Sequence, residues 1–378
     1  MENPFKKIFQ GMLKPSNPSV LGIDIGSSSI KVVQLKKKGG KAVLETYGEL
    51  ALGPYSGLEM GRATNLPTER VSEALKDLLR EAKTSTKQCG VAIPIGSSMV
   101  TMIELPKVPE KELAQMIPLE ARKYIPVPIS EVSLDWWVIP EEPAETSEES
   151  EAVQPSAPVL GKVEKVQVLS VAIHNEVISR YQDIIAKSGI EASFIEIEIF
   201  STIRALIDKS PGAIMIIDLG AGSTKLYIVD RGIVRNSHTI NRGSQDITIA
   251  LSSSLGVSIP EAENIKRSFG AVQRTDEKAI ADTISLTTDF IFSESNRVLQ
   301  NYQKKYNKNI AKVVLAGGGL GYKGLLELAK HAFEVEVMLG EPFSKVEFPA
   351  FLEPTLRMTG SEFSVAIGVA LRRLQELP

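Results

Sequence analysis

The chain has 378 residues, which is enough for two or three domains of ordinary size. Hydrophobic residues make up 43% of the sequence, as in a globular core, and 43 Lys and Arg against 46 Asp and Glu give a formal net charge of -3. This balance argues against a nucleic-acid binder held mainly by bulk positive charge. The lone cysteine, Cys89, excludes a disulfide framework and a zinc site built from cysteines.

The first 17 residues form a short amphipathic pattern. Phe5, Ile8, Phe9 and Met12 share one face of a helix. The segment lacks the long apolar block of a signal peptide, and no run in the sequence approaches the ~20 apolar residues that span a bilayer. We therefore expect a docking helix at 1–17, and weak membrane contact is the alternative.

Residues 140–160 contain an acidic, proline-rich segment. From Pro140 to Pro158 there are six Glu, four Pro and no Lys or Arg, so the segment has little apolar surface to bury and repels itself. A strand-like run and a helix-like run follow it directly. We expect a disordered loop that is inserted within a domain and does not separate two domains.

Two parts of the sequence share a strand, a Gly-rich turn and a second strand. The same residue types recur at offsets 0, 2, 5 and 7 of both parts. These residues are Asp24, Gly26, Ser29 and Lys31 in the first copy and Asp218, Gly220, Ser223 and Lys225 in the second. Such a match between distant segments predicts an internal duplication, with two related α/β halves.

The chemistry of each turn suits a polyphosphate. Glycine lets the backbone approach closely, and the turn brings N–H groups and hydroxyls together. We expect phosphate contacts from both turns, namely from Gly26, Ser27, Ser28, Ser29, Lys31, Gly220, Ala221, Gly222, Ser223 and Thr224. Asp24 and Asp218 at the strand ends would hold a hydrated Mg²⁺. One such turn alone would favour a structural hairpin, whereas a matched pair favours a binding site.

A third Gly-rich segment follows an apolar strand pattern near the carboxyl end. Gly317, Gly318 and Gly319 precede an amphipathic helix, whose start offers N–H donors and a positive dipole end to a nucleotide. The spacing that begins at Gly319 also satisfies the G-x-G-x-x-G fingerprint, but no further βαβ units follow it, so a dinucleotide-dependent dehydrogenase is a weak alternative. The sequence contains no G-x-x-x-x-G-K-[ST], which excludes a P-loop NTPase.

The three segments, in this order, resemble the two phosphate motifs and the adenosine motif of the actin-like ATPase superfamily. The resemblance implies an α/β actin-like fold, with two related halves around a nucleotide cleft and ATP and Mg²⁺ as ligands. It divides the chain into a docking segment at 1–17, subdomain 1A at 18–93, an inserted subdomain 1C of the FtsA type at 94–190, a connecting helix of 1A at 191–210, subdomain 2A at 211–245, subdomain 2B at 246–309, the rest of 2A at 310–361 and a helix returning to 1A at 362–378.

The same resemblance assigns roles to three residues outside the turns. Glu196, in the expected connecting helix at 193–206, would be the catalytic residue near the metal or the attacking water. Glu263 and Lys266 would lie beside the ribose and adenine. An exposed ion pair, three residues apart on a helix, is the alternative interpretation of these last two residues.

The insert between the phosphate motifs resembles the PilM family of type IV pilus assembly proteins. It has ELP at 104–106, KEL at 111–113 and EARKYIP at 120–126, and the resemblance covers almost the whole chain from Val20 onward. FtsA carries a comparably placed insert but normally adds a carboxyl-terminal linker and a membrane helix. This sequence ends directly after the second expected connecting helix, which favours the PilM family.

That resemblance implies an ATP-binding adaptor in the cytoplasm, peripheral at the inner face of the inner membrane. Its 1C subdomain would bind the N-terminal cytoplasmic peptide of PilN and, through PilN, connect to PilO. Pilus motor ATPases and further copies of the chain are other expected partners. Leu113, Ile117, Tyr124 and Ile125 lie at helical spacings and would line the peptide groove. The alternative is that this stripe forms the subdomain's own core.

We expect slow or absent ATP turnover from such an adaptor. A metabolite kinase of the same superfamily is one alternative, but it would need a carboxylate that deprotonates an acceptor hydroxyl. No acidic residue stands in an obvious acceptor motif. A membrane-associated filament protein like FtsA, anchored by residues 5–12, is the other alternative.

Overall fold

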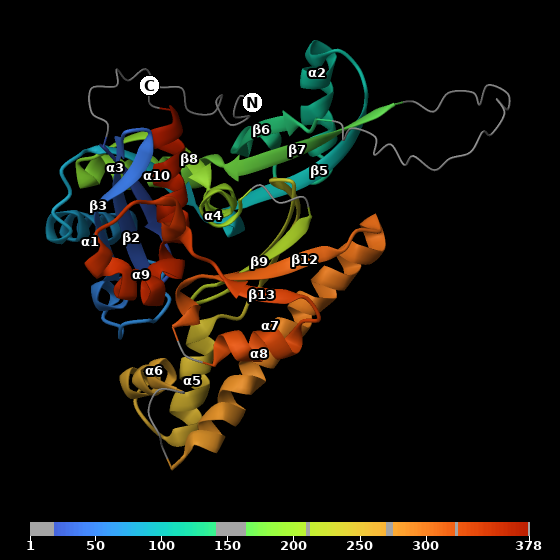
Figure 1. Cartoon of the computed structure of the whole chain (residues 1–378). Helices are drawn as coiled ribbons and strands as arrows, with labels where there is room; N and C mark the ends of the chain where they lie inside the picture. Colours follow the sequence, from blue (N-terminus) through green and yellow to red (C-terminus); the bar gives the residue numbers. More distant parts are fainter. Residues whose placement is uncertain (1–18, 141–163, 209–211, 270–274, 322–323, 377–378) are drawn as a thin grey trace. The chain divides into compact units, whose positions relative to one another are not determined.

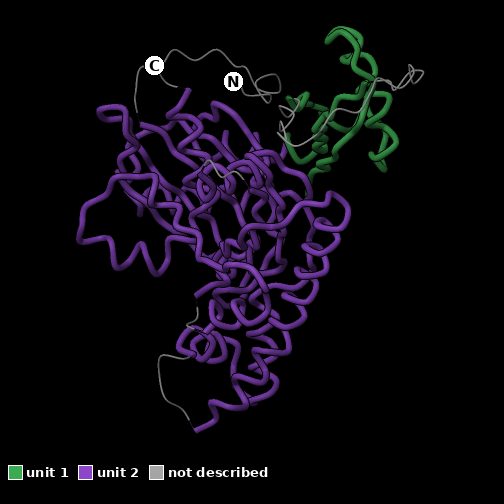
Figure 2. The backbone as a smooth tube through the Cα atoms, turned by 45° about the vertical axis from the view of Figure 1, so that its right-hand side comes forward, with its two compact units in different colours: residues 1–8, 97–178 green, residues 9–96, 179–378 purple. Residues whose placement is uncertain are grey.

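The computed structural model describes residues 19–140, 164–208, 212–269, 275–321 and 324–376 (Figure 1). The expected docking helix at 1–17 and nearly all of the expected loop at 140–160 lie outside these residues. The chain divides into two compact units, which we describe separately (Figure 2). The described part of the smaller unit is 97–140 and 164–178, and the larger unit holds the other described residues.

Two five-stranded sheets of the same topology form the framework of the larger unit. In spatial order, the first sheet consists of β3 (Lys41–Ala51), β2 (Ser29–Lys38), β1 (Ser19–Ile25), β4 (Gln88–Ile93) and β8 (Glu191–Ile197). The second consists of β11 (Ile233–Ile240), β10 (Thr224–Asp230), β9 (Ala213–Leu219), β12 (Ile310–Ala316) and β13 (Glu336–Leu339). In each sheet the central strand is antiparallel to one neighbour and parallel to the other. The predicted duplication into two α/β halves is therefore confirmed.

Helices pack against both sheets of the larger unit. α1 (Thr68–Glu81) and α10 (Ser364–Glu376) cover opposite faces of the first sheet, and α4 (Glu198–Leu206) crosses α10. The core of the second sheet includes residues of α5 (Ser244–Leu255), α6 (Ile259–Ser268), α7 (Glu277–Tyr306) and α8 (Leu325–Ala332). The described chain also contains the helices α3 (Asn175–Ser188) and α9 (Glu353–Thr359). No described helix is both long and apolar enough to cross a lipid bilayer.

The apolar patterns of the sequence explain these elements. All seven residues of β9 are buried, because a central strand with covered faces has no solvent side. α1 instead buries one stripe that includes Val71, Leu75 and Leu78, at the spacing of a helix with one face on the core.

Two glycines allow α10 to approach its neighbours closely. A methyl group placed on Gly22 of β1 would lie 1.9 Å from the carbonyl oxygen of Ala366 in α10. A methyl group placed on Gly368 would lie 1.9 Å from the carbonyl oxygen of Ser201 in α4. Neither distance is compatible with a side chain, so both contacts require glycine.

The expected connecting helix at 193–206 is only partly helical. Residues up to Ile197 extend the first sheet as strand β8, which pairs in parallel with β4, and the helix α4 begins at Glu198. The segment has an isoleucine at every second position from Ile195 to Ile199, which fits a buried strand as well as a helix. Pairing with β4 makes this segment a strand up to Ile197. As a result Glu198, and not Glu196, lines the cavity described below.

The smaller unit is a three-stranded antiparallel sheet with a helix. β7 (Lys165–His174) lies between β5 (Ser98–Pro106) and β6 (Val132–Val138), and α2 (Glu110–Ala121) packs on one face. Buried residues of the helix, Leu113, Ile117 and Ala121, contribute to a core with Ile103 and Val168 of the strands. This unit therefore has its own apolar core.

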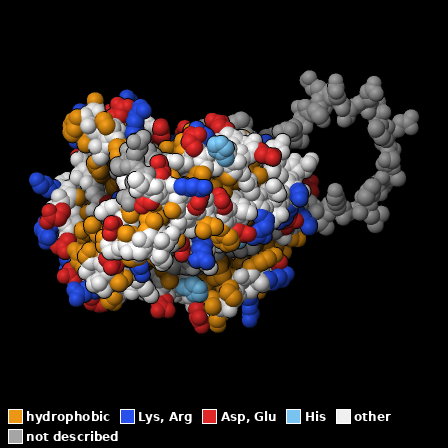
Figure 3. All heavy atoms as spheres, turned by 90° about the horizontal axis from the view of Figure 1, so that it is seen from below, with side chains coloured by type: hydrophobic (Ala, Val, Ile, Leu, Met, Phe, Trp, Pro, Cys, Tyr) orange, Lys and Arg blue, Asp and Glu red, His pale blue; other side chains and the backbone are white. Residues whose placement is uncertain are grey.

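Charged groups are well mixed on the face of the molecule shown in Figure 3. Lys and Arg side chains alternate there with Asp and Glu side chains, and hydrophobic side chains lie between them. This mixture agrees with the formal net charge of -3 for the whole chain.

The crossing of α10 and α4 gives a first prediction. Gly368→Ala should lower the free energy of unfolding by about 2–3 kcal/mol, because its methyl group would overlap the Ser201 carbonyl. Chemical denaturation of the full chain measures this loss. Gly96→Ala is the control, because nothing lies within 4 Å of a methyl group there. Equal denaturation midpoints for the two variants would contradict the prediction.

Candidate functional site

The duplicated turns of the two halves have the same backbone geometry. The N–H of Gly26 donates to the carbonyl of Ser29, and the N–H of Gly220 donates to the carbonyl of Ser223, both at 3.0 Å. Each bond closes a tight turn between the first and second strand of its sheet. The local backbone that the sequence repeat predicts is thus formed twice.

Strand pairing brings one acid and one base together in each half. Asp24 of β1 lies opposite Lys31 of β2, and Asp218 of β9 lies opposite Lys225 of β10. Adjacent strands place such partners within a few ångströms of each other. The spacing of seven residues seen in the sequence is therefore the spacing of a cross-strand pair.

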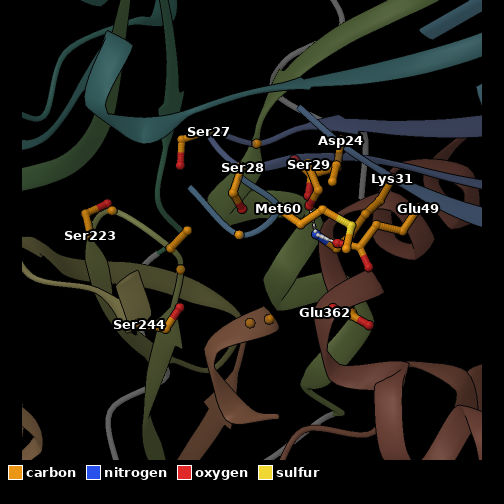
Figure 4. A pocket seen from close by; sticks show the side chains of 18 of the residues that line it. Asp24, Ser27, Ser28, Ser29, Lys31, Glu49, Met60, Ser223, Ser244 and Glu362 are labelled. Atoms are coloured by element: carbon orange, nitrogen blue, oxygen red, sulfur yellow. Dashed lines mark hydrogen bonds and ion pairs between the residues drawn. The ribbon is translucent and has the colours of Figure 1, made fainter. Parts of the chain in front are cut away.

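Both turns line one cavity of about 870 Å³ within the larger unit. This volume lies in the range of small-molecule sites, roughly 300–1,000 Å³. Figure 4 shows serines of both halves around the same space, Ser27 and Ser28 from the first turn and Ser223 from the second. The predicted residues that line the cavity are Asp24, Gly26, Ser27, Ser28, Ser29, Lys31, Asp218, Gly220, Ala221, Gly222, Ser223, Glu263, Lys266, Gly317 and Gly318.

Two residues predicted to contact the nucleotide are not part of this lining. Thr224 is fully buried, and its hydroxyl donates to the carbonyl of Arg242 at 2.8 Å. Gly319 lies against Leu219, where a methyl group would come within 2.5 Å of the leucine side chain. Both residues belong to the predicted Gly-rich segments, but Thr224 holds the backbone at Arg242 and Gly319 packs against Leu219.

The structure corrects the expected role of Glu196. Its side chain is only 2% exposed and lies outside the cavity lining. Its carboxylate accepts from Arg204 at 2.7 Å, from Arg372 at 2.8 Å and from the hydroxyl of Ser201 at 2.6 Å. Burial works to raise the pKa of Glu196, but the two guanidinium groups outweigh it and lower the pKa. Glu196 thus joins β8, α4 and α10 and does not face the cleft.

The cavity instead contains Glu198, which the sequence analysis missed. One carboxylate oxygen accepts from the backbone N–H of Ile95 at 2.7 Å, and the other accepts from Lys225 Nζ at 2.6 Å. Glu198 is the first residue of α4 and lines the cavity beside Asp24 and Asp218. Glu196 and Glu198 lie in one run in which isoleucine and glutamate alternate, so the sequence pattern does not separate their roles. They differ because the strand ends at Ile197, between them.

One part of the cavity, which we call its floor, is rich in buried charge and is lined by Asp24, Asp218, Glu198, Lys31 and Lys225. Burial raises the pKa of Asp24 to about 6, against the opposing effect of Lys31. Burial also raises the pKa of Asp218, which Lys225 opposes. Lys31 donates to Ser29 Oγ at 2.7 Å and pairs with Glu49 at 3.1 Å, as the dashed lines in Figure 4 indicate.

Glu263 and Lys266 form a buried ion pair and not an exposed one. Their side chains are 14% and 7% exposed, with 2.7 Å between Lys266 Nζ and Glu263 Oε2. Thr248 of α5 donates to the same carboxylate at 2.7 Å and accepts from Lys266 at 2.9 Å. Burial lowers the pKa of Lys266 despite the neighbouring carboxylate. The pair is therefore a fixed part of the cavity wall.

A segment of the first half that no motif indicated also lines the cavity. Leu58, Glu59, Met60 and Gly61 follow a 3-10 turn and precede α1. Two residues further on, the N–H of Ala63 donates to the side chain of Gln245 in α5 at 3.1 Å. This contact joins the first half of the fold to the second across the cavity.

The side chains that line the cavity fit a hydrated metal ion. Among the described residues, no three His, Cys, Asp or Glu side chains converge in a geometry that could hold a metal. Asp24 and Asp218 line the cavity, but the nearby Glu198 carboxylate is already paired with Lys225. The donors present would suit a hydrated divalent cation, which is the form expected from the sequence.

Comparison with known proteins identifies the family. The family model of type IV pilus assembly protein PilM matches residues 22–374. The chain belongs to this family. The match spans both halves of the larger unit and the smaller unit. The predicted PilM family is thus confirmed, and the solved structures below confirm the predicted actin-like fold.

Similar proteins agree with this assignment. A solved PilM–PilN type IV pilus biogenesis complex is 25% identical, with a TM-score of 0.76, and covers 94% of this chain and 98% of that chain. MreB 5 of Spiroplasma citri bound to AMPPNP has a TM-score of 0.51 at 13% identity, over 96% of this chain and 98% of that chain, which shows the actin-like fold alone. Cell division protein FtsA of Neisseria meningitidis serogroup B is 24% identical over 335 residues, which are 78% of this chain and 77% of that protein.

Three of the four residues expected to line a peptide groove are core residues of the smaller unit. Leu113, Ile117 and Ile125 are buried with the strands of that unit. This corrects their role in favour of the alternative, because an apolar stripe on a helix packs first on its own sheet. Tyr124 is 51% exposed and is the remaining candidate of the four.

Glu362 at the edge of the cavity gives a prediction about pH. Burial, together with the nearby Glu49 carboxylate, raises the pKa of Glu362 to about 7. The folded state thus holds this proton more tightly than the unfolded state, so stability falls as pH rises from about 4.5 to 7. Glu362→Gln should make this fall smaller, while Asp24, whose pKa burial also raises, still contributes below about pH 6. At pH 8 the variant should be more stable than the natural chain by on the order of 2 kcal/mol.

The measurement is denaturant unfolding at several pH values between 4.5 and 8. The exposed Glu334, changed to Gln, is the control and should leave the pH profile unchanged. If Glu362→Gln shows the same pH dependence as the natural chain, the buried carboxyl is not the group that titrates.

Proposed function

We propose that the chain binds ATP in the cavity of the larger unit. The observation that carries this proposal is that two turns, 194 positions apart in sequence, have the same backbone geometry and line one cavity. Two sets of N–H groups and hydroxyls would surround the triphosphate from both halves. Phosphate oxygens need this density of donors, because each carries several lone pairs and charge.

The adenosine would lie toward the second half. Gly317 and Gly318 line the cavity after β12, and the buried pair of Glu263 and Lys266 forms another part of its wall. Fixed polar groups of this kind orient a nucleoside. A hydrated Mg²⁺ would accompany the phosphates near Asp24 and Asp218.

Lys31 gives a direct test of nucleotide binding. Lys31→Met should weaken the affinity for ATP in Mg²⁺ buffer at least about tenfold, because it removes a cation from the cavity wall and leaves Glu49 unpaired there. Isothermal titration calorimetry measures the affinity.

Lys36→Met is the matched control for this test. Lys36 lies on the same strand and also pairs with a glutamate, Glu45 at 3.2 Å, but outside the cavity lining. It should bind ATP like the natural chain. Undetectable ATP binding by the natural chain, or equal affinity of both variants, would contradict the proposal.

The bound nucleotide would act mainly as a conformational ligand, with slow turnover. ATP that contacts both turns binds a closed arrangement of the halves better than an open one and shifts the population accordingly. Glu198 is the carboxylate in a position to orient water, but both of its oxygens are already engaged by Ile95 and Lys225. This pairing supports an adaptor more than a fast ATPase.

We further propose that the smaller unit binds the N-terminal cytoplasmic peptide of PilN. Family membership and the similarity to a solved PilM–PilN complex support this partner. The chain would then work in the cytoplasm at the inner face of the inner membrane and connect cytoplasmic components to PilN and PilO. Pilus motor ATPases and self-association remain further proposals.

The exposed apolar residues of the smaller unit are the candidates for this contact. Leu119, Tyr124 and Ile129 are 71%, 51% and 38% exposed and lie within one stretch of eleven residues after the middle of α2. Single exposed apolar side chains are common, but three within one short stretch favour a protein contact, because a partner that covers them removes apolar surface from water.

Tyr124→Ala should weaken binding of a synthetic N-terminal peptide of the cognate PilN at least about fivefold, because an exposed aromatic side chain contributes much of the energy in a peptide contact. Calorimetric titration of the full chain measures the effect. Phe351→Ala is the control, since Phe351 is 78% exposed and lies in the larger unit. Equal peptide affinity of the two variants would place the contact elsewhere.

A further inference from the structure

The two lysines of the duplicated hairpins have different surroundings. Lys31 and Lys225 occupy the same place in their halves, each opposite the aspartate of the preceding strand. On its other side, Lys31 lies opposite Glu49 of β3, whereas Lys225 lies opposite Thr239 of β11. The first lysine therefore has a carboxylate partner within its own sheet, and the second has only a neutral side chain at that position.

Lys225 finds its carboxylate at the start of α4 instead. Its ammonium lies 2.6 Å from Glu198 Oε2, and its side chain is 20% exposed and lines the cavity. Burial works to lower the pKa of Lys225, but Glu198, Asp218 and Asp24 outweigh it and raise the pKa. The ammonium thus stays charged and acts on all three carboxylates of the cavity floor.

This arrangement disfavours a metal ion that is bound directly to the carboxylates of the floor. A divalent cation at the floor would need carboxylate oxygens, but Glu198 already accepts from Ile95 and Lys225 with its two oxygens. To reach the aspartates, the cation would also have to lie beside an ammonium and be repelled by it. The same ammonium offers three N–H donors to a phosphate oxygen.

We propose that Lys225 is a resident cation of the nucleotide site, which contacts the terminal phosphates of a nucleoside triphosphate and replaces much of the contribution of a divalent cation at the paired aspartates. This inference rests on the proposed nucleotide binding. It goes beyond it because it assigns an unusually weak metal dependence to the binding step and names the side chain responsible. Lys31 differs from Lys225 because groups of its own sheet hold its ammonium, Ser29 Oγ at 2.7 Å and Glu49 at 3.1 Å.

The test compares the affinity for ATP in Mg²⁺ and in EDTA by isothermal titration calorimetry. For the natural chain, removal of Mg²⁺ should weaken binding by less than about threefold. Lys225→Met should bind ATP at least about tenfold more weakly in EDTA than in Mg²⁺, because the metal then has to supply the positive charge that Lys225 provided. Lys225→Arg should restore the weak metal dependence.

Two further variants separate a loss of the cation from a loss of stability. Lys225→Met leaves Glu198 buried without its ionic partner and could lower stability, so the same comparison is made in Glu198→Gln and in the double variant. The double variant should show the strong metal dependence, and Glu198→Gln alone should not.

The possible outcomes separate the two proposals. Two results would overturn the role of Lys225 while nucleotide binding stands. One is a natural chain whose affinity for ATP is tenfold or more weaker in EDTA than in Mg²⁺. The other is a double variant whose affinity for ATP, relative to the natural chain, falls by the same factor with and without Mg²⁺. A natural chain that binds no ATP under either condition would overturn the proposed function itself.

Discussion

The close crossing of three backbones at glycine is the constraint on which the cavity depends. α10 lies directly on β1 at Gly22 and directly on α4 at Gly368. Because α4 begins at the end of the first sheet, these contacts fix where that sheet presents its turn and where Glu198 enters the cavity. The buried Glu196, bound by Arg204 and by Arg372 of α10, strengthens the same crossing. A buried ion pair with several donors holds a specific geometry more than it adds stability.

A second consequence is that the cavity collects charge which the fold must neutralise. Seven carboxyl groups and four basic side chains line it. Each of its three ammonium groups has a carboxylate partner: Glu49 for Lys31, Glu198 for Lys225 and Glu263 for Lys266. Burial shifts the pKa of Asp24 to about 6, which shows how unfavourable an unbalanced carboxylate is there. An anionic ligand with its own counter-ion enters a site whose charges are already arranged in pairs.

Duplication supplied two copies of one hairpin, and their divergence gave them different roles. The backbone of the turns and the opposition of Asp and Lys are the same in both halves. The third strand differs, with Glu49 in one copy and Thr239 in the other. Both lysines line the cavity, but Lys31 pairs with Glu49 of its own sheet and Lys225 with Glu198 of α4, so a symmetrical framework carries an asymmetrical site. The smaller unit, with its own core, adds a surface for a partner without altering this framework.

The sequence by itself determined the duplication, the two turns, the third Gly-rich segment and the family, because strand period, glycine and spacing are local properties. It also named most of the residues that line the cavity. Tertiary structure alone decided which glutamate of the alternating run faces the cleft, since Glu196 and Glu198 have the same neighbours in sequence. It likewise decided that Ile117 is core while Tyr124 is exposed, and that residues 58–61 join the cavity. These outcomes depend on contacts between distant segments, and no local pattern encodes such contacts.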